Sequence, residues 1–208
     1  MTVITGTGYT QPDFESDIVK TSMGDLEMVF IGHGTLMFRL PAYVIHIDPV
    51  SDYADYGSLD DADLVLVTHH HGDHLDPGAI SKITRPGTKI ICSASCSNEL
   101  EGPIIMKNGD LLEIDGLVID AVPAYNILHK RANGELFHPK GVGNGYVLTF
   151  GDTKIYIAGD TENIPEMAFL EDIDIAFLPM NLPYTMSPEM VAGAVAMFHP
   201  TILYPYHY

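Results

Sequence analysis

Short apolar runs dominate the first half of the chain, and glycine, proline and acidic residues separate them. Runs of this kind that end at turn-forming residues are typical of β-strands. The predicted strands of this half cover residues 26–32, 35–40, 43–48, 62–68 and 88–92. Two helices are predicted among them, at 76–83 and 93–100. Asp76 suits the N-cap of the first helix and Pro77 its first turn.

Hairpins characterise the middle of the second half. Residues 109–124 and 145–160 each hold two apolar runs, which are joined at Asp115-Gly116 and at Gly151-Asp152. Aspartate and glycine readily adopt the backbone angles that tight hairpin turns require. Beyond these hairpins a helix, a strand, a second helix and a last strand are predicted, at 164–170, 173–179, 187–198 and 201–208.

The two halves have a similar order of elements, and this order predicts the fold class. Each begins with several strands and continues with alternating helices and strands. We expect an α/β (α+β) fold in which two mixed sheets pack face to face with helices outside, a four-layer αββα sandwich. Residues 1–208 suffice for a single domain of this kind. The stretch 125–144 has little periodicity, and so long a loop in a compact domain is usually functional.

The charge of the chain limits its partners. Its 208 residues include 28 Asp and Glu but only 10 Lys and Arg, which gives a formal charge of −18. Such a field repels nucleic acids and anionic membranes, so a small molecule is the expected partner; self-association into a homo-oligomer is left open. The N-terminal 20 residues lack a leader pattern and no stretch is apolar enough to span a bilayer, so a cytoplasmic protein is expected.

Four of the ten histidines lie in one short segment, VTHHHGDHLD, together with two aspartates. Side chains two residues apart on an extended chain point the same way, so His69 and His71 can face one point. Gly72 allows a sharp turn that brings Asp73 and His74 to a second point nearby. Imidazole and carboxylate donors in this arrangement suit zinc, and also manganese or iron. The segment therefore predicts part of a metal site.

The spacing His69-x-His71-x-Asp73-His74 resembles the metal motif of the metallo-β-lactamase-fold hydrolase superfamily. Further residues match the pattern of this family in the same order along the chain: Asp48, His138, Asp160 and His207. The segments GHGTL, PAYN, FHPKG, IYIAGDTE and LPYTMSPE are similar to those of a branch of small bacterial and archaeal proteins that resemble ascorbate-6-phosphate lactonase. The resemblance covers almost the whole chain and implies the metallo-β-lactamase fold.

The resemblance implies two sites for divalent ions, zinc in the first place, with manganese or iron as alternatives. The implied ligands are His69, His71 and His138 for one ion and Asp73, His74 and His207 for the other. Asp160 would bridge both ions, and Asp48 would brace a ligand from outside. A hydroxide activated by both ions would attack an ester, lactone or phosphodiester of a small anionic metabolite, with Asp73 and Asp160 as catalytic carboxylates. Because His207 is penultimate, weaker binding at its ion is expected.

Two residues of the long loop compete for the third histidine of the pattern, and His138 is preferred over His129 because it precedes a glycine-rich entry to the next strand. Polar side chains of the similar segments are expected at the pocket: His33, Tyr125, Asn126, Lys140 and Tyr184. Lys140 is a candidate partner for an anionic group of the substrate. Structural or packing roles are expected for the remaining histidines and for both cysteines, although His46 could also support a ligand: His46, His70, His199, Cys92 and Cys96.

Several other functions share parts of this pattern. A phosphodiesterase or nuclease is the nearest, but the acidic charge and the lack of room for RNA-docking insertions disfavour a large polyanion. A thioesterase of the glyoxalase II type shares the ligands without the similar segments. A β-lactamase usually lacks histidine at the position of His74, and di-iron oxidoreductases usually have glutamate at that of His71. A metal-bearing binding or sensor protein without turnover is the alternative outside the enzymes.

Overall fold

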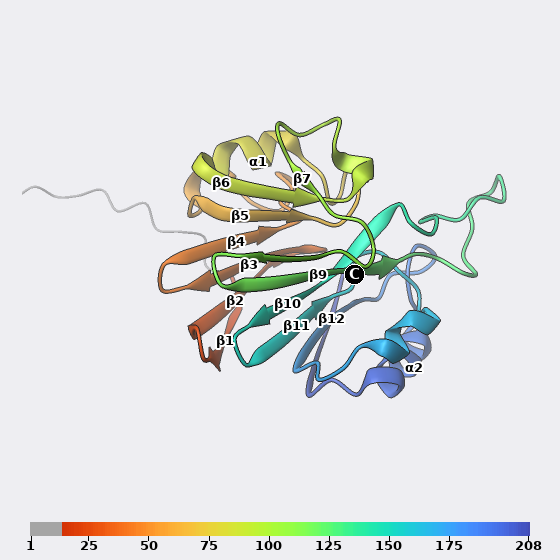
Figure 1. The fold of residues 1–208 in the computed structure, drawn as a ribbon. Helices are drawn as coiled ribbons and strands as arrows, with labels where there is room; N and C mark the ends of the chain where they lie inside the picture. Colours follow the sequence, from red (N-terminus) through yellow and green to blue (C-terminus); the bar gives the residue numbers. More distant parts are fainter. Residues whose placement is uncertain (1–13) are drawn as a thin grey trace, which may run out of the picture.

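The computed structural model describes residues 14–208, which form two sheets packed face to face with helices outside (Figure 1). Residues 1–13, part of the stretch inspected above for a leader pattern, lie outside the described residues. Each sheet contains both antiparallel and parallel pairs of strands. The prediction of an α/β, four-layer αββα sandwich of two mixed sheets is confirmed.

The first sheet has seven strands in the order β1-β2-β3-β4-β5-β6-β7. Neighbours from β1 to β4 are antiparallel, and neighbours from β4 to β7 are parallel. The strands are β1 Ser16–Thr21, β2 Gly24–Gly32, β3 Thr35–Leu40, β4 Tyr43–Ile47, β5 Ala62–Val67, β6 Thr84–Cys92 and β7 Ile104–Ile105.

The second sheet has six strands in the order β13-β12-β11-β10-β9-β8. Strands β8 to β11 pair antiparallel, with the two predicted hairpins joining β8 to β9 and β10 to β11, and β11, β12 and β13 pair parallel. The strands are β8 Leu111–Ile114, β9 Leu117–Ala124, β10 Gly143–Phe150, β11 Thr153–Ile157, β12 Ile175–Pro179 and β13 Ile202–Tyr206.

Helices cover the outer faces, and two of them begin as predicted. The helices are α1 Pro77–Ile83, α2 Pro188–Phe198, η1 Tyr56–Ser58, η2 Ala94–Cys96 and η3 Pro165–Phe169. Asp76 caps α1 and Ser187 caps α2, each by accepting backbone N–H groups of the first turn. The helices predicted at 93–100 and 164–170 are only short 3₁₀ turns, η2 and η3. Ser, Asn and Cys, which fill the first of these segments, are poor helix formers.

Alternate residues along the strands of the first sheet face two different cores. Leu64 and Leu66 of β5 pack in the core between the sheets, whereas Val65 and Val67 pack with α1. A third core lies between the second sheet and α2 with η3, and Val191 of α2 belongs to it. Among residues 14–208, no helix is both long and apolar enough to cross a membrane.

Strand β1 was not predicted, because its side chains do not alternate. It lies at the edge of the first sheet, and its apolar Ile18 is 67% exposed. The strand pairs antiparallel with β2, from Ser16 opposite Val29 to Thr21 opposite Gly24. An edge strand needs only one partner and tolerates polar side chains, so its apolar pattern is weak.

The parallel strands of both sheets end at one edge of the sandwich, and this arrangement places the site. Parallel strands have their carboxyl ends together. Asp48 follows β4 and Thr68 follows β5 in the first sheet, and Asp160 and His207 follow β11 and β13 in the second. The backbone N–H of Asn144, near the start of β10, donates to the carbonyl of Thr68 at 2.9 Å and joins the two sheets at this edge.

Candidate metal centre

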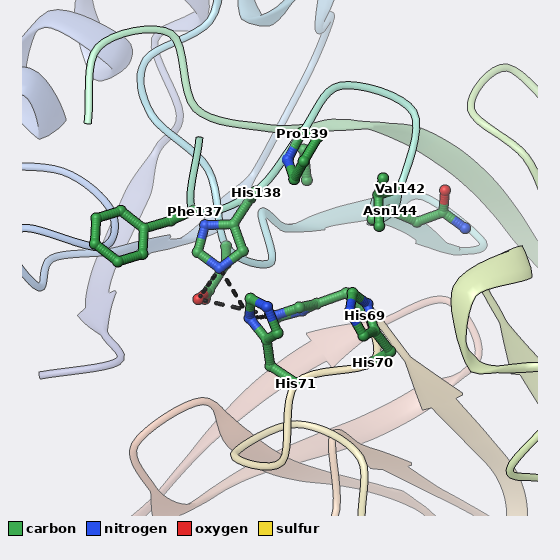
Figure 2. Close-up of a pocket in the computed structure, with 11 residues that line it drawn as sticks. His69, His70, His71, Phe137, His138, Pro139, Val142 and Asn144 are labelled. Carbon is green, nitrogen blue, oxygen red and sulfur yellow. Dashed lines mark hydrogen bonds and ion pairs between the residues drawn. The ribbon is translucent and has the colours of Figure 1, made fainter. Parts of the chain in front are cut away.

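Three imidazoles and one carboxylate form what we call the first group, which consists of His69, His71, His138 and Asp160. Nε2 of His69 lies 3.0 Å from Nδ1 of His71, and Nε2 of His138 lies 3.2 Å from the same nitrogen. Figure 2 shows the rings of His71 and His138 turned toward one another. Oδ2 of Asp160 lies 3.0 Å from Nε2 of His138. Nitrogen and oxygen donors from distant parts of the chain therefore converge on one point.

The second group consists of His33, Asp73, His74 and His207. Nε2 of His207 lies 3.0 Å from Nε2 of His74 and 3.5 Å from Oδ2 of Asp73. His33, expected in the pocket and not among the ligands, places its Nε2 3.3 Å from the same carboxylate oxygen. Its ring also packs on that of His207, with centroids 3.8 Å apart. The donor atoms of each group lie within 4.8 Å of one another.

Asp160 lies between the two groups. Its Oδ2 faces the first group, 3.0 Å from Nε2 of His138 and 3.9 Å from Nε2 of His69. Its Oδ1 faces the second group, 3.3 Å from Nε2 of His74 and 3.2 Å from Nε2 of His207. One carboxylate therefore contacts both groups, which is the geometry that a bridging ligand needs.

The donor atoms of both groups fit divalent cations. Oδ1 of Asp160 is buried and makes no hydrogen bond with any of the described residues. Imidazole nitrogens face each other at 3.0 Å in both groups, between His69 and His71 and between His74 and His207. A hydrogen-bonding proton can be shared by only two of these nitrogens, whereas a metal ion accepts lone pairs from several ligands at once. Imidazole and carboxylate donors are those that zinc, manganese and iron accept.

Asp48 braces the second group from outside. Its fully buried carboxylate lies 2.7 Å from Nδ1 of His74, and it accepts hydrogen bonds from the backbone N–H and the hydroxyl of Thr68, both at 2.7 Å. A carboxylate on one ring nitrogen fixes the orientation of the other nitrogen and makes it a better ligand. Asp48 therefore turns Nε2 of His74 toward Asp160 and His207.

Asn126 braces the first group in the same way. Its Oδ1 lies 2.7 Å from Nδ1 of His138 and accepts the backbone N–H of the same residue at 2.8 Å. Its Nδ2 donates to Oε1 of Glu162 at 3.0 Å and to the carbonyl of Tyr184 at 2.8 Å. Asn126 was expected at the pocket, and the structure places it behind an imidazole of the first group.

Glu162 is a buried acid that the sequence analysis did not single out. It accepts the backbone N–H groups of Ile127, Leu128 and His129 at 2.7–2.8 Å and lies 2.7 Å from Nδ1 of His129. Burial raises the pKa of Glu162, but these hydrogen bonds, that of the His129 N–H first, outweigh burial and lower it. Glu162 thus fixes the start of the long loop. A second acid two residues after Asp160 was the available clue.

Charge interactions hold the carboxylates of the site ionised. Burial raises the pKa of Asp160, but the charge of His74 and the hydrogen bond to His138 outweigh it and hold that pKa well below its ordinary value. Burial likewise raises the pKa of Asp73, and hydrogen bonds with His207 and His33 lower it far more. Both carboxylates therefore remain acceptors across the physiological range of pH.

The imidazoles of the two groups differ in their pKa. Burial, followed by the nearby His74, lowers the pKa of His69 well below its ordinary value. Burial and the nearby His138 lower the pKa of His71 to about 4. Burial also disfavours charge on His74, but the carboxylates of Asp160 and Asp48 outweigh it and raise its pKa well above the ordinary value. Without a cation, the first group is therefore neutral at His69 and His71, and the second is protonated at His74.

His138, and not His129, lies in the first group. His138 is buried, and its Nε2 faces both His71 and Asp160. His129 lies 2.7 Å from Oε1 of Glu162 through Nδ1, at the start of the long loop. The preference for His138 over His129 thus agrees with the geometry.

The side chains expected in structural or packing roles lie outside both groups. His46 is fully buried, with Nε2 3.0 Å from the carbonyl of Asp60. His70 is exposed, and His199 ends α2 in the left-handed conformation. Cys92 and Cys96 are free thiols in the core beneath α1.

Lys140 is not among the residues that line the cavity beside the two groups, and its role toward the substrate stays a prediction. Its ammonium group forms an ion pair with Glu166 and lies 4.8 Å from the centroid of the Tyr125 ring. The hydroxyl of Tyr125 donates to the same carboxylate at 2.9 Å, so Tyr125 is also turned away from the two groups. In this structure the partner of Lys140 is therefore an acid of η3, Glu166.

A cavity of about 460 Å³ borders both groups. Tyr184 and Asn181, which follow β12, lie along its rim together with Phe137 and Arg131 of the long loop. Tyr184 was expected at this position, whereas Arg131 was not. A second, much smaller cavity of about 10 Å³ is lined by residues of the first group together with Val142 (Figure 2).

Gly34 lets the turn between β2 and β3 approach the second group closely. A Cβ atom at this position would lie 2.8 Å from Cε1 of His74 and 3.3 Å from Cδ2 of His207. The preceding residue, His33, has a φ of 51° and accepts the backbone N–H of His207 at 2.9 Å through its carbonyl. This turn therefore ties the segment after β13 to the site.

Comparison with known sequences places the chain among related proteins. Residues 27–207 match the family model described as Beta-lactamase superfamily domain. The chain is 36% identical over 159 residues to a UPF0173 metal-dependent hydrolase of Thermococcus onnurineus, a match that covers 71% of this chain and 67% of that protein.

Comparison with solved structures gives matches to the same kind of protein. A candidate metal-dependent hydrolase from Parabacteroides distasonis is 49% identical, with a TM-score of 0.90 over 94% of this chain and 89% of that one. Igni18, a metallo hydrolase from Ignicoccus hospitalis, is 24% identical, with a TM-score of 0.72 over 88% of this chain and 82% of its own. The second likeness supports the fold alone.

Proposed function

The chain belongs to the beta-lactamase superfamily, and from this premise we propose that it is a metal-dependent hydrolase acting on an ester, lactone or phosphodiester of a small anionic metabolite. The observation that carries the proposal is the position of Asp160, whose two oxygens face two separate groups of imidazoles. The names of the relatives, metal-dependent hydrolases, support the reaction class. The substrate class rests on the resemblance of the segments named above to those of lactonase-like proteins and on the chemistry of the site.

The first and second groups would each hold one divalent ion, zinc or else manganese or iron, with Asp160 shared between them. Bound cations supply Lewis acidity and lower the pKa of a coordinated water toward neutrality. His33 belongs to the second group by position, although it was expected only at the pocket. It therefore either completes that ligand set or faces the substrate from beside Asp73.

The chain orients the donors before any substrate arrives. Asp48 and Asn126 each hold the outward nitrogen of an imidazole, of His74 and His138, so the inward Nε2 presents its lone pair. Asp160 is held ionised by the surrounding imidazoles. Because most of these side chains are buried, the reacting bond would meet fixed dipoles in place of bulk water.

His33 is the candidate for the residue that protonates the leaving group. Its Nε2 lies 3.3 Å from Oδ2 of Asp73, and the ring borders the cavity. An imidazole can take up a proton at one ring nitrogen and pass it on, so a ring at this position could carry a proton from the attacking water to the leaving group. Nε2 of His33 would thus hold the proton that the departing alcohol requires.

The cavity suits a small substrate. Its volume of about 460 Å³ lies in the range of pockets for single metabolites. The chain carries a formal charge of −18, which disfavours docking of long nucleic acids. A phosphodiester substrate would therefore be a small one.

The test starts with elemental analysis of the purified protein. Zinc-loaded and manganese-loaded protein are then assayed on a panel of lactones, phosphodiesters and thioesters, beside protein treated with a chelator. We expect hydrolysis of one bond class that disappears with the cations and returns when they are added back. Activity that survives full removal of metal contradicts the proposal. Binding of a panel member without its consumption would indicate a sensor.

A further inference from the structure

Arg131 lies where the long loop meets the cavity beside the two groups. The loop joins β9 to β10 and extends outward from the sheets (Figure 1). Among the described Lys and Arg residues, Arg131 is the one that lines this cavity. Positively charged side chains are scarce in this chain, which has 28 Asp and Glu but only 10 Lys and Arg.

The position of Arg131 is fixed by its own loop. Its backbone N–H donates to the carbonyl of Glu135 at 2.7 Å, and its carbonyl accepts from Gly134 at 2.9 Å. The guanidinium carbon lies 5.0 Å from the centroid of the Phe137 ring, and Nη2 donates to the carbonyl of Phe137 at 3.3 Å. A guanidinium stacked on a ring is held in place at little cost in entropy, so Arg131 is prepared for a ligand.

No carboxylate of the described residues forms an ion pair with Arg131. Lys140, on the same loop, is instead neutralised by Glu166. The carboxylates that line the cavity, Asp73 and Asp160, face imidazoles. A guanidinium has several N–H donors in a planar fork, and most of those of Arg131 remain available to a bound anion.

The contact of Arg131 with the first group also bears on its role. Nη2 lies 3.3 Å from Nε2 of His71, whose Nδ1 faces His69 and His138. When Nδ1 donates its lone pair to a cation, the neutral ring carries its proton on Nε2, which then can only donate. Two donors do not bond each other, so metal loading frees this N–H of Arg131 for the cavity.

We propose that Arg131 binds an anionic group of the substrate, a carboxylate or a phosphate, and thereby selects acidic substrates. The guanidinium is separated from the donors of the first group by one imidazole ring, that of His71. The anionic group therefore lies close to the bond that is cleaved. This inference rests on the proposed function and names the substrate feature that the site recognises.

A binding experiment tests the inference without turnover. Inorganic phosphate is titrated by calorimetry into zinc-loaded wild-type protein and into the variants Arg131→Gln, Arg131→Lys and Lys130→Gln, after their zinc contents are shown to be equal. Lys130→Gln removes the same charge from the adjacent exposed residue and is the matched control. We expect Arg131→Gln to raise the Kd for phosphate about tenfold to a hundredfold. Arg131→Lys should lose less, and Lys130→Gln should match wild type.

A kinetic experiment identifies the anion. Three lactones that differ only in bearing a phosphate, a carboxylate or no charge are compared by kcat/KM. Arg131→Gln should lower kcat/KM for the preferred acidic lactone about tenfold to a hundredfold and leave the neutral lactone unchanged. The acidic lactone with the greater loss names the anion.

The two proposals fail in different ways. Equal Kd values in Arg131→Gln and Lys130→Gln, or an equal loss on charged and neutral lactones, overturn the role of Arg131. If wild type cleaves none of the lactones or other panel substrates, the proposed function fails, while the phosphate titration still decides whether Arg131 binds anions.

Discussion

The first group of the metal centre is mostly enclosed and has supporting partners behind two of its three imidazoles, whereas the second is partly open. In the first, Nδ1 of His138 faces Asn126 and Nδ1 of His69 lies 3.0 Å from the hydroxyl of Thr68. The side chains of His69, His138 and Asp160 are 4%, 7% and 3% exposed. His69 and His138 are therefore held by neighbours that do not themselves bind the cation, while His71 is half-buried.

In the second group, Asp48 supports His74, but Nδ1 of His207 is buried without a hydrogen-bond partner among the described residues. The side chain of Asp73 is 42% exposed and that of His33 is 17% exposed. Partners of the outward nitrogen raise the metal affinity of an imidazole. We therefore expect the first group to bind its cation more tightly, which is how one site can combine a resident ion with an exchangeable one.

The largest effect is expected from Asp160→Asn, which removes the charge that both groups share. Cations at both groups lose their common ligand, so elemental analysis should find neither ion retained, and hydrolysis should fall to the level of chelator-treated protein. Asp61→Asn, at an exposed acid away from the site, is the control. Retention of one tightly bound ion in Asp160→Asn would show that the groups act separately.

The next effect separates the groups, through His71→Ala in the first and Asp73→Ala in the second. Both variants should lose activity, because the reaction needs both cations. After dialysis Asp73→Ala should retain about one ion per chain and His71→Ala almost none, since the second group alone binds weakly. Equal metal contents in the two variants would contradict the proposed difference.

A smaller effect is expected from Asn126→Ala, which acts behind the first group. Nδ1 of His138 loses its acceptor, so metal affinity or activity should fall about 10-fold to 100-fold. Asn133→Ala, on the same loop, removes an exposed amide whose hydrogen bonds within residues 14–208 are with Glu135, and it should match wild type. Titration of zinc against a competing chelator measures both variants. An unchanged zinc affinity in Asn126→Ala would show that the orientation of His138 does not depend on this bond.

The smallest expected effect is a difference in proton release between the groups. The pKa of His71 is lowered to about 4 and that of His69 is also lowered. Near neutral pH a cation can therefore bind at the first group without displacing a proton from either imidazole. The pKa of His74 is raised, so a cation must displace a proton from it. Binding at the second group should therefore weaken as pH falls, while binding at the first persists until His71 is protonated.

Calorimetric titration of zinc in buffers of different ionisation enthalpy measures these protons. The weakly bound ion should release about one proton from His74, whereas the tightly bound ion should release none from His69 or His71. The reverse order would mean that the second group fills first.

The part of this architecture that the sequence predicts is its local part. Strand alternation and hairpin turns follow from neighbouring residues, and so does the placement of His69 and His71 after β5. The later residues His138, Asp160 and His207 could be assigned only by resemblance, because their approach depends on how the sheets pack.

Other features depend on contacts that no local pattern encodes. The role of Glu162 depends on hydrogen bonds from backbone N–H groups of a loop that lies 33 to 35 residues away along the chain. Lys140 looked free in the sequence, but the structure pairs it with Glu166 of η3. His33 reaches the second group only because β13 ends beside the turn between β2 and β3.

The close approach at Gly34 has a consequence for how this protein can diverge. A methyl group there would lie 2.8 Å from the ring of His74, so almost any replacement must displace a donor of the second group. A residue with no chemical function of its own is thereby placed under the same selection as the ligands. Tolerance to substitution in this turn should therefore report the geometry of the centre, and a deep mutational scan would find position 34 as intolerant as position 74.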